Sequence, residues 1–459
     1  KLKKEIEMKR IISCILAVIF AVSMVFLGIG CKEEAAPAEE AVEEEAAPAE
    51  EEAEEPVVEE KKYEGVELKI MVHAGSSGER PIYEFAEEFY DKTGAKISIE
   101  TVAWENIMPK LMASIEAGEG GYDISYTNPE FTYTLWPNLL PLNPYIEKYN
   151  YDTSDWFEAA VKYGEGIGDD PDIRYTIPAS MVVAPVFYNT EKIPEYPTTW
   201  EGYEEVLAEN TNPPEEYGLA VAGVPVQTVR QFYARFWSLG DPLLTPDWKP
   251  LINNENGVKA LEMLKKTIDN FTPPGVLGWD NPDAGAAFAS GLCATYEGWT
   301  GNVLTFLENP AENKIGDNWA VAMYPEGGTG NMTDNSFAIF KTTKNPDAAF
   351  EFVAEFTNKE NSKRWAVEYA LETPISSIYD DPEVQAAQPW FKGYKEALDV
   401  AKPAFWRVPQ WIELFIPTGE MVSKYLSGEI TDPQVALDQL AATWEEAIEK
   451  AIPDFEYME

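Results

Sequence analysis

The stretch that decides the fold runs from residue 66 to residue 104: "VELKIMVHAGSSGERPIYEFAEEFYDKTGAKISIETVAW". Its first ten residues are largely apolar and lead into a glycine- and serine-rich run, which predicts a strand followed by a loop. Ile82, Phe85 and Phe89 then recur at helical spacing up to Gly94, which predicts a helix with a glycine stop. Residues 95–104 predict a second strand.

The next segments repeat this alternation. Residues 105–121 predict a helix and "YDISYTN" (122–128) predicts a third strand. The order strand, helix, strand, helix, strand implies parallel pairing in an α/β layer. Further along, Thr198 with Glu201 three residues later predicts a capping box. Apolar stripes predict core-facing helices over residues 345–358 and near the C-terminus.

Composition limits the function classes. The chain has 459 residues, 45% of them hydrophobic, and a net charge of −45. Nucleic-acid binding is excluded because it needs Lys and Arg patches. The single histidine, His73, leaves no material for a histidine metal site or a Ser-His-Asp triad, so we expect no metal and no cofactor. Cys293 is expected to be a small buried hydrophobe.

The N-terminus has the pattern of an export signal. From Met8 it reads "MKRIISCILAVIFAVSMVFLGIGC", with two basic residues, an apolar run and small residues before Cys31. Residues 1–7 have the character of upstream read-through. The cysteine resembles a bacterial lipobox, which implies cleavage before Cys31 and a lipid on that residue. Gly28 stands where the usual leucine is expected, and an uncleaved membrane helix stays open as an alternative.

A glutamate-rich segment follows over residues 32–62. It carries no aromatic residue, and its like charges repel one another. We expect an extended, solvated tether between the anchor and the folded body.

The order of pieces in the body resembles the family 1 extracellular solute-binding proteins, the maltose-binding-protein-like receptors of carbohydrate ABC importers. The resemblance runs from Val66 to Ile452 and rests on a collinear set. This set is "LKIMVHAG…FAEEFYDKTGAKISI", "WENIMPKLMASIEAGEGGYDISYTN", "LLPLNPYI", "YTIPASMVVAPVFYNTE", "PTTWEGYEEVLAE", "FASGLCATYEGWTGN" and "FAIFKTTKNPDAAFEFVAEFTNKENSKRWAVEYALETPI".

The resemblance implies an α/β, two-lobed periplasmic-binding-protein fold with three crossovers and the ligand in the interlobe cleft. We place the crossovers near Ala184, Ser336 and Ile375. The N-terminal lobe is then 63–184 plus 336–375, and the C-terminal lobe is 185–335 plus 376–459, after a signal segment 1–31.

Ligand contacts are expected in the loops at the carboxyl ends of strands. The candidates combine tryptophans with hydroxyl, amide and carboxyl groups, which suits the apolar face and hydroxyl rim of a sugar ring. They are Ser76, Ser77, Trp104, Thr127, Asn128, Glu130, Glu297, Trp299, residues 331–335 with Asn335 foremost, Trp406 and Arg407.

Several candidates have an alternative structural role. Trp104 at a strand end also suits the core, Asn128 also suits a cap before Pro129, and Arg407 also suits a surface ion pair. Trp299 lies in a polar turn between glycines, which favours ligand contact. Trp237 and Trp444 lie on helical faces and are expected in the core.

The stretch "PAFWRVPQW" (403–411) holds two tryptophans five positions apart. In an extended chain they face opposite sides, so we expect Trp406 to be the platform under the ligand and Trp411 to pack inward.

The predicted function is a substrate-binding lipoprotein at the cell envelope. It captures a neutral carbohydrate by hinge closure and delivers it, as a monomer, to the membrane permease of an ABC importer. Two alternatives stay open. One is the same fold with a cationic solute such as a polyamine, held by carboxylates and cation–π contacts. The other is a secreted glycoside-acting enzyme with paired carboxylates.

Overall fold

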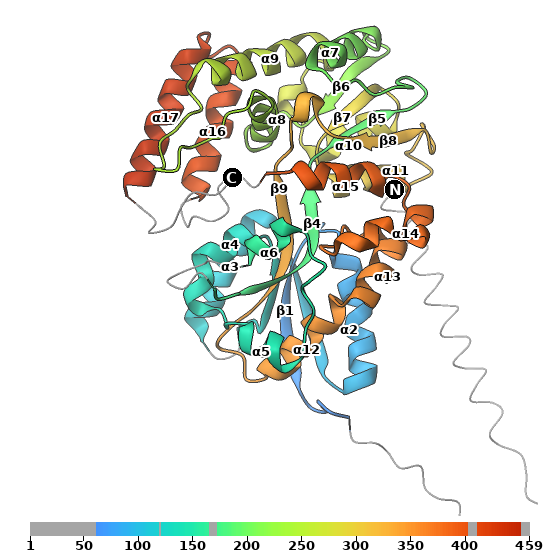
Figure 1. The fold of residues 1–459 in the computed structure, drawn as a ribbon, viewed down its shortest axis with the longest axis vertical. Helices are drawn as coiled ribbons and strands as arrows, with labels where there is room; N and C mark the ends of the chain where they lie inside the picture. The colour runs from blue at the N-terminus through green and yellow to red at the C-terminus, as the bar shows by residue number, and fades with distance from the viewer. Residues whose placement is uncertain (1–60, 119–120, 165–171, 403–410, 451–459) are drawn as a thin grey trace, which may run out of the picture. The chain divides into compact units, whose positions relative to one another are not determined.

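The structure is a computed structural model that describes residues 61–118, 121–164, 172–402 and 411–450. The described chain builds two α/β layers, each around its own sheet (Figure 1). We call the elements around the first sheet the first lobe and those around the second sheet the second lobe. The predicted signal segment and nearly all of the predicted tether, up to residue 60, lie outside the described residues.

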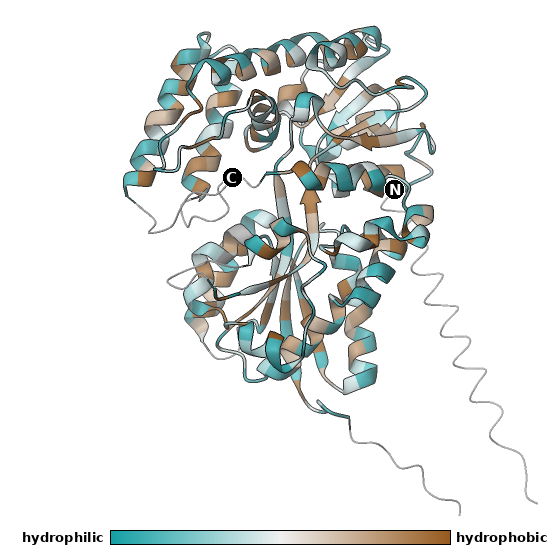
Figure 2. Ribbon diagram, in the orientation of Figure 1, coloured by the Kyte–Doolittle hydropathy of each residue, from teal (hydrophilic) through white to brown (hydrophobic). Residues whose placement is uncertain are grey.

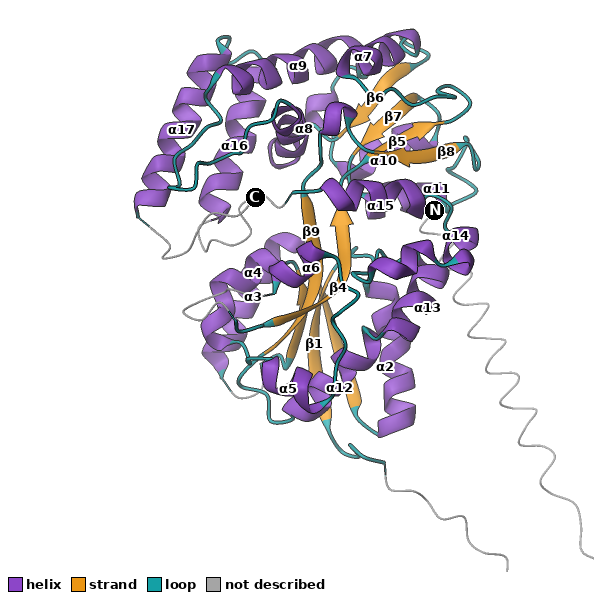
Figure 3. Cartoon of the chain, viewed as in Figure 1, coloured by secondary structure: helices purple, strands orange, loops and turns teal. Residues whose placement is uncertain are grey.

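The first sheet has the strand order β2-β1-β3-β9-β4. Figure 3 shows its strands in orange, with β1, β4 and β9 labelled. Its strands are β1 (Glu67–His73), β2 (Lys96–Val102), β3 (Ile124–Thr127), β4 (Thr176–Val183) and β9 (Met332–Ile339). The pairing of β1 with β2 and with β3 is parallel, as the alternation of strands and helices predicts. By contrast, β9 runs antiparallel to both β3 and β4.

Helices cover this sheet and complete the first lobe. They are α2 (Glu79–Thr93), α3 (Trp104–Ala117), α4 (Pro129–Leu135), η1 (Trp136–Asn138), α5 (Asn143–Lys148), α6 (Glu158–Tyr163), α12 (Pro346–Phe356), α13 (Lys359–Tyr369), η4 (Ser376–Asp380) and α14 (Pro382–Ala387). The predicted stripe of α2 is confirmed, because Ile82, Phe85 and Phe89 are buried. Gly94 ends this helix with a φ of 82°, a conformation that glycine adopts without a steric penalty.

The second sheet has the order β6-β7-β5-β8. Its strands are β5 (Val186–Asn189), β6 (Tyr217–Val221), β7 (Cys293–Glu297) and β8 (Trp319–Ala322). The surrounding helices are α7 (Trp200–Glu209), α8 (Pro225–Ser238), α9 (Glu255–Phe271), η2 (Val276–Gly278), α10 (Asn281–Ala289), α11 (Thr300–Leu307), η3 (Pro325–Gly327), α15 (Phe391–Val400), α16 (Trp411–Leu426) and α17 (Pro433–Glu449).

The chain passes between the two sheets at places that only partly match the prediction. The first crossing lies between β4 and β5, beside Ala184. The second lies between β8 and β9, so the predicted boundary at Ser336 falls inside β9, which pairs with β4 from Met332 onward. After the predicted third boundary at Ile375, α14 still packs on α13, whereas α15 packs on β8. Residues 60–459 form one compact unit, and the two-lobe division by residue number stays a prediction.

Core formation follows the hydropathy of the chain. Strands β4 and β9 are buried along nearly their whole length because both faces are covered. Figure 2 shows β4 in brown, whereas the helices mix hydrophobic and hydrophilic residues. Cys293 is buried and not disulfide-bonded, and Trp237 and Trp444 are buried, as predicted.

One local prediction is wrong by a residue. The N-cap of α7 is Thr199, whose side chain accepts a hydrogen bond of 3.1 Å from the Gly202 backbone N–H. Thr198, which matches the capping-box pattern through Glu201, lies one residue before the cap, and the residue three positions after Thr199 is Gly202. The cap is therefore a threonine without the predicted glutamate partner.

Candidate solute-binding site

The loop between β1 and α2 carries the first two predicted site residues. The Ser76 hydroxyl donates a hydrogen bond of 2.7 Å to the carbonyl of His73, which fixes the start of the loop. The Ser77 hydroxyl is buried and has no hydrogen-bond partner. Gly78 permits a close approach, since a Cβ at this position would lie 2.1 Å from the Tyr126 hydroxyl oxygen. The loop is therefore pressed against the end of β3.

The end of β3 and the start of β9 bring together three more predicted residues, Thr127, Asn128 and Asn335, all buried. Asn128 Nδ2 donates to the Asp334 carbonyl at 3.0 Å, and Asn335 Nδ2 donates to Ser180 Oγ at 3.1 Å. Although Asn128 occupies the N-cap position of α4, its side chain makes no capping hydrogen bond. It is turned instead toward β9.

Several buried polar atoms of these residues and of the neighbouring strand ends and loops have no hydrogen-bond partner. Buried polar groups normally have partners, so these atoms are candidates for hydrogen bonds with a solute or water. We call these atoms the polar cluster: His73 Nδ1, Ser77 Oγ, Asn128 Oδ1, both side-chain polar atoms of Asn331, Asp334 Oδ1 and both carboxylate oxygens of Glu372.

The polar cluster is held in a largely uncharged state. Burial raises the pKa of Asp334 to about 7, and a hydrogen bond of 2.6 Å from the Ser336 hydroxyl opposes that rise. Burial likewise raises the pKa of Glu372 to about 7. Burial lowers the pKa of His73, and the nearby Asn335 side chain opposes this shift. In this conformation the cluster therefore offers neutral donors and acceptors below about pH 7.

Trp104 is the first residue of α3 and is half-buried. Its ring lies 5.7 Å from the ring of Phe131 and 6.1 Å from that of Trp411, edge to face in the second case. Trp411 begins α16 in the second lobe and is 2% exposed, which confirms that it packs inward. Trp104 thus packs against the core on one side and keeps part of its surface open.

Trp299 is held in place from the second lobe. It is half-buried at the N-cap of α11, and its ring lies 5.0 Å from the guanidinium of Arg230. The Tyr296 hydroxyl donates to the Trp299 carbonyl at 3.2 Å. Gly298 is required beside it, because a Cβ there would lie 2.2 Å from the Tyr296 hydroxyl oxygen. These contacts fix an aromatic side chain that still has exposed surface.

Glu297 has a role that the sequence did not indicate. It is fully buried and forms a two-point ion pair with Arg235, with both N···O distances 3.1 Å. The Tyr203 hydroxyl donates to the same carboxylate at 3.2 Å. The guanidinium of Arg235 also lies 4.9 Å from the Trp200 ring. Both carboxylate oxygens of Glu297 are thus paired inside the second lobe.

Four predicted residues lie beyond what the structure describes. Trp406 and Arg407 fall in residues 403–410 and Cys31 falls in residues 1–60, all outside the described residues. Glu130 belongs to α4, but its side chain is also outside the description. Their predicted contacts stay predictions.

Two members of the polar cluster, His73 and Glu372, were not predicted. A signal for Glu372 does exist in the sequence, since it is a single acidic residue among the apolar residues of "YALETPI" near a predicted crossover.

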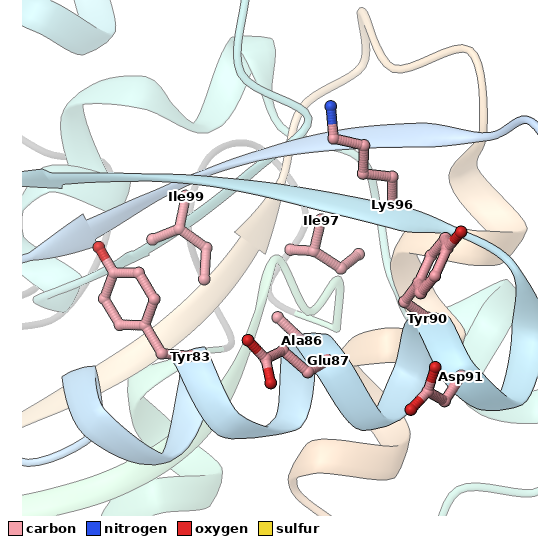
Figure 4. A pocket seen from close by; sticks show the side chains of 8 residues that line it. All are labelled: Tyr83, Ala86, Glu87, Tyr90, Asp91, Lys96, Ile97 and Ile99. Carbon is pink, nitrogen blue, oxygen red and sulfur yellow. The ribbon is translucent and has the colours of Figure 1, made fainter. Parts of the chain in front are cut away.

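Other features of the described residues lie apart from this site. A groove of about 600 Å³ separates α2 from the edge strand β2 (Figure 4). Its lining residues are Tyr83, Ala86, Glu87, Tyr90, Asp91, Lys96, Ile97 and Ile99, none of them a predicted site residue. Across the described ranges no cluster of side chains has the composition of a metal site. Nor is any helix there long and apolar enough to span a bilayer.

Comparison with known proteins agrees with this architecture. A family model described as "Bacterial extracellular solute-binding protein" matches residues 84–391. Among solved structures, a solute-binding protein of an ABC transporter from Agrobacterium radiobacter K84, in complex with ribitol, superimposes with a TM-score of 0.73. It is 19% identical, and the match covers 84% of this chain and 100% of that one.

Two further structures are similar to the same extent. Maltose-bound T. maritima MalE3 gives a TM-score of 0.74 at 18% identity, covering 83% of this chain and 99% of that one. A solute-binding protein of an ABC transporter from Thermotoga lettingae TMO, bound with alpha-D-tagatose, gives 0.72 at 18% identity, covering 83% and 100%. At such identities these matches establish the two-lobed periplasmic-binding-protein fold.

Proposed function

Because the chain belongs to the family of bacterial extracellular solute-binding proteins, we propose that it captures a neutral carbohydrate and delivers it to the permease of an ABC importer. The solute is a sugar, an oligosaccharide or a polyol, bound between the lobes and released without chemical change. The protein acts as a monomer at the outer face of the membrane, with no cofactor and no metal.

The observation that carries this proposal is the polar cluster beside half-buried tryptophans. A sugar or polyol brings several hydroxyls, each of which both donates and accepts a hydrogen bond, and the cluster holds unpartnered atoms of both kinds. Trp104 and Trp299 supply apolar ring faces for the C–H surface of such a solute. The solved structures named above hold ribitol, maltose and tagatose, which supports the same solute class.

A cationic solute is less well supported by the same site. Of the carboxylates in the region, Glu297 is already neutralised by Arg235. Burial raises the pKa of both Asp334 and Glu372, which favours their uncharged forms. A polyamine needs ionised carboxylates as partners.

Capture by closure requires that the solute bind the closed arrangement better than the open one. A solute with a micromolar dissociation constant releases about 8 kcal/mol on binding, which is ample to drive a hinge against a modest opening preference. In this proposal the crossovers at Ala184, between β8 and β9, and after α14 act as the hinge segments.

The proposal also includes the anchor. Cys31 carries the lipid after removal of residues 1–30, and the glutamate-rich tether gives the binding body reach toward the permease. Cys31→Ala should move the protein from the membrane fraction to the soluble fraction. Retention of that variant in the membrane would support the uncleaved-helix alternative.

The test of solute class is a thermal-shift screen over monosaccharides, oligosaccharides, polyols and polyamines, since a solute that binds only the folded state raises the melting temperature. A shift with polyamines alone would overturn the carbohydrate assignment. Release of product from glycosides incubated with the protein would overturn the assignment as a binding protein.

Trp299→Ala should weaken binding of the solute found in the screen by about tenfold or more, since loss of an aromatic contact costs about 1–3 kcal/mol. Trp319→Ala is the matched control. Trp319 is also half-buried in the second lobe, but it lies at the far end of the second sheet. It pairs with Asn189 at one end of β5, whereas Glu297, close to Trp299 in the chain, pairs with Val186 at the other end. Equal losses of affinity in both variants would argue against Trp299 as a contact.

A further inference from the structure

Glu372 occupies an unusual place in the fold. It lies in the short segment between α13 and η4, next to the left-handed C-cap residue Ala370, which has a φ of 54°. Its backbone carbonyl accepts a hydrogen bond of 2.6 Å from the Met181 N–H on β4, close to the first crossing between the sheets. Its side chain is fully buried.

The two lobes meet around this side chain. From the first lobe comes Ser77, in the loop between β1 and α2, and from the second lobe comes Thr300, the first residue of α11. Both hydroxyls are near enough to the Glu372 carboxyl to oppose the rise of its pKa. The loops also approach each other, since a Cβ at Gly301 would lie 3.9 Å from the Gly75 carbonyl oxygen.

The junction supplies no positive charge to Glu372 among the described residues. The titratable side chains coupled to it are Tyr126 from β3, Tyr379 from η4 and Tyr394 from α15. Burial raises the pKa of each of these phenols, so they are neutral. The Tyr394 hydroxyl is itself engaged, as it accepts from the Val183 N–H at 2.8 Å and donates to the Met181 carbonyl at 3.1 Å.

An ionised carboxylate is therefore costly in this arrangement. A buried charge without an ion pair or hydrogen bonds is strongly unfavourable, and the group avoids that cost either by taking up a proton or by returning to water. Glu372 returns to water if the Ser77 loop and the start of α11 separate, which is the movement that opens the lobes.

We propose that Glu372 is a proton-binding site at the junction of the lobes, and that its protonation favours closure whereas its ionisation favours opening. This inference rests on the proposed function, because it assigns a regulation to the same closing movement that captures the solute. Its consequence is that solute affinity falls as the pH rises.

The direction and range follow from the two states of the carboxyl. In the arrangement that the structure describes, with the Ser77 loop and the start of α11 both beside this side chain, burial raises the pKa of Glu372 from 4.5 to about 7; we take this arrangement as the closed one. In the open arrangement the exposed carboxyl returns to its ordinary range. The ratio of closed to open molecules is therefore highest below about pH 4.5 and falls as the pH rises toward about 7. Above about pH 7 this ratio no longer changes with pH. The pKa difference of about 2.5 between the two arrangements limits the change in the ratio of closed to open molecules to about 300-fold, and we expect that ratio to change by at least about tenfold.

The closing movement is measurable without any solute. Dyes on Glu87→Cys in α2 and Lys259→Cys in α9, both exposed positions, report the distance between the lobes by energy transfer in a Cys14→Ala/Cys31→Ala background. Cys293 is buried and leaves these two sites for labelling. We expect the ratio of closed to open molecules to fall by at least about tenfold between about pH 5 and about pH 8, and Glu372→Gln to abolish the change.

Asp347→Asn is the control, because Asp347 lies outside the polar cluster and pairs with Lys148 at the surface of the first lobe. Its hydrogen bond with Lys148 lowers the pKa of Asp347, so this carboxyl does not titrate between about pH 5 and about pH 8 and the variant should keep the pH dependence of closure. Glu372→Leu provides a second variant of similar size should Glu372→Gln fold poorly. The pH dependence of energy transfer in the labelled protein with Glu372 intact tests the inference even if both variants fail to fold.

Three results would overturn the inference: no change of energy transfer with pH, an unchanged pH response in Glu372→Gln, or loss of the pH response in Asp347→Asn. Isothermal titration of maltose and ribitol over the same pH range then separates the two proposals. Failure of both to bind, together with failure of the wider carbohydrate screen, would reject the proposed function. A closure that still depends on pH through Glu372 would leave the proton site in place.

Discussion

The ion pair between Arg235 and Glu297 gives the most direct test of how the second lobe is held together. Both side chains have no exposed surface, and two N–H···O contacts of 3.1 Å join them. Arg235 also donates to the Gln231 carbonyl at 3.0 Å, and Glu297 accepts from Tyr203. We predict that Glu297→Gln destabilises the protein strongly, because it leaves the Arg235 charge buried without a counter-charge.

The magnitude follows from the complete burial. Removal of one partner from a buried ion pair costs about 3–5 kcal/mol. The entropy of unfolding is about 2.1 cal/mol/K per residue, so for a folded body of about 400 residues each kcal/mol lowers the melting temperature by about 1.2 °C. Glu297→Gln should therefore lower the melting temperature by about 4–6 °C.

Calorimetry and urea unfolding of Glu297→Gln measure this loss. The double variant Arg235→Met/Glu297→Leu should recover most of it, since an apolar pair of similar volume replaces a buried ion pair at little cost. Glu355→Gln is the matched control, because its ion pair with Lys92 is largely exposed and contributes at most about 1 kcal/mol. An unchanged melting temperature combined with lost solute binding would refute this reasoning and restore Glu297 as a ligand contact.

Three further predictions concern single side chains. Burial raises the pKa of Asp334 to about 7, above its unfolded value. The contribution of this carboxyl to the free energy of unfolding is therefore fully present at low pH and is lost as the pH rises through about 7. Asp334→Asn should remove that pH dependence in urea unfolding, and an unchanged pH profile would contradict it. Burial raises the pKa of the Cys293 thiol to about 12, so iodoacetamide should label this residue only in urea, which peptide mapping checks. Trp411→Ala should cost about 3–5 kcal/mol in calorimetry by removing its contacts with Trp104 and Phe131, and a loss under about 1 kcal/mol would refute that packing.

The first lobe was predictable where its signals are local. The stripe of α2 and the left-handed glycine that ends it depend on neighbours within a few turns, and both appear in the structure as expected. The start of β9 was not predictable in the same way. All eight of its residues are buried, so the strand has no alternation that marks where it enters the first sheet. A sequence-based boundary near Ser336 therefore falls inside β9, which pairs with β4 from Met332 onward, and the lobe division by residue number stays a prediction.

The site shows the same division between local and tertiary information. Ser77 and Asn128 follow β1 and β3, which pair in parallel, and the rule that loops after parallel strands gather at one edge predicts that they lie near each other. Their contact with a solute stays a prediction. Glu297 is the last residue of β7, yet its partner Arg235 lies on α8, 62 positions earlier in the chain. The sequence marks Glu372 only as a single acid among apolar residues, and no local pattern indicates that Ser77 and Thr300 lie beside it.

The polar cluster also indicates how closure can be selective. Each unpartnered buried donor or acceptor costs about 1–3 kcal/mol, so closure without a solute is penalised at several atoms at once. A solute that places hydroxyls against these atoms removes the penalty, and this difference is the differential affinity that a hinge movement requires. An analogue that lacks one such hydroxyl leaves the penalty in place and loses affinity twice over, for the missing bond and for the atom left unpartnered. Deoxy analogues of the bound solute should therefore discriminate more sharply than analogues that merely add a methylene.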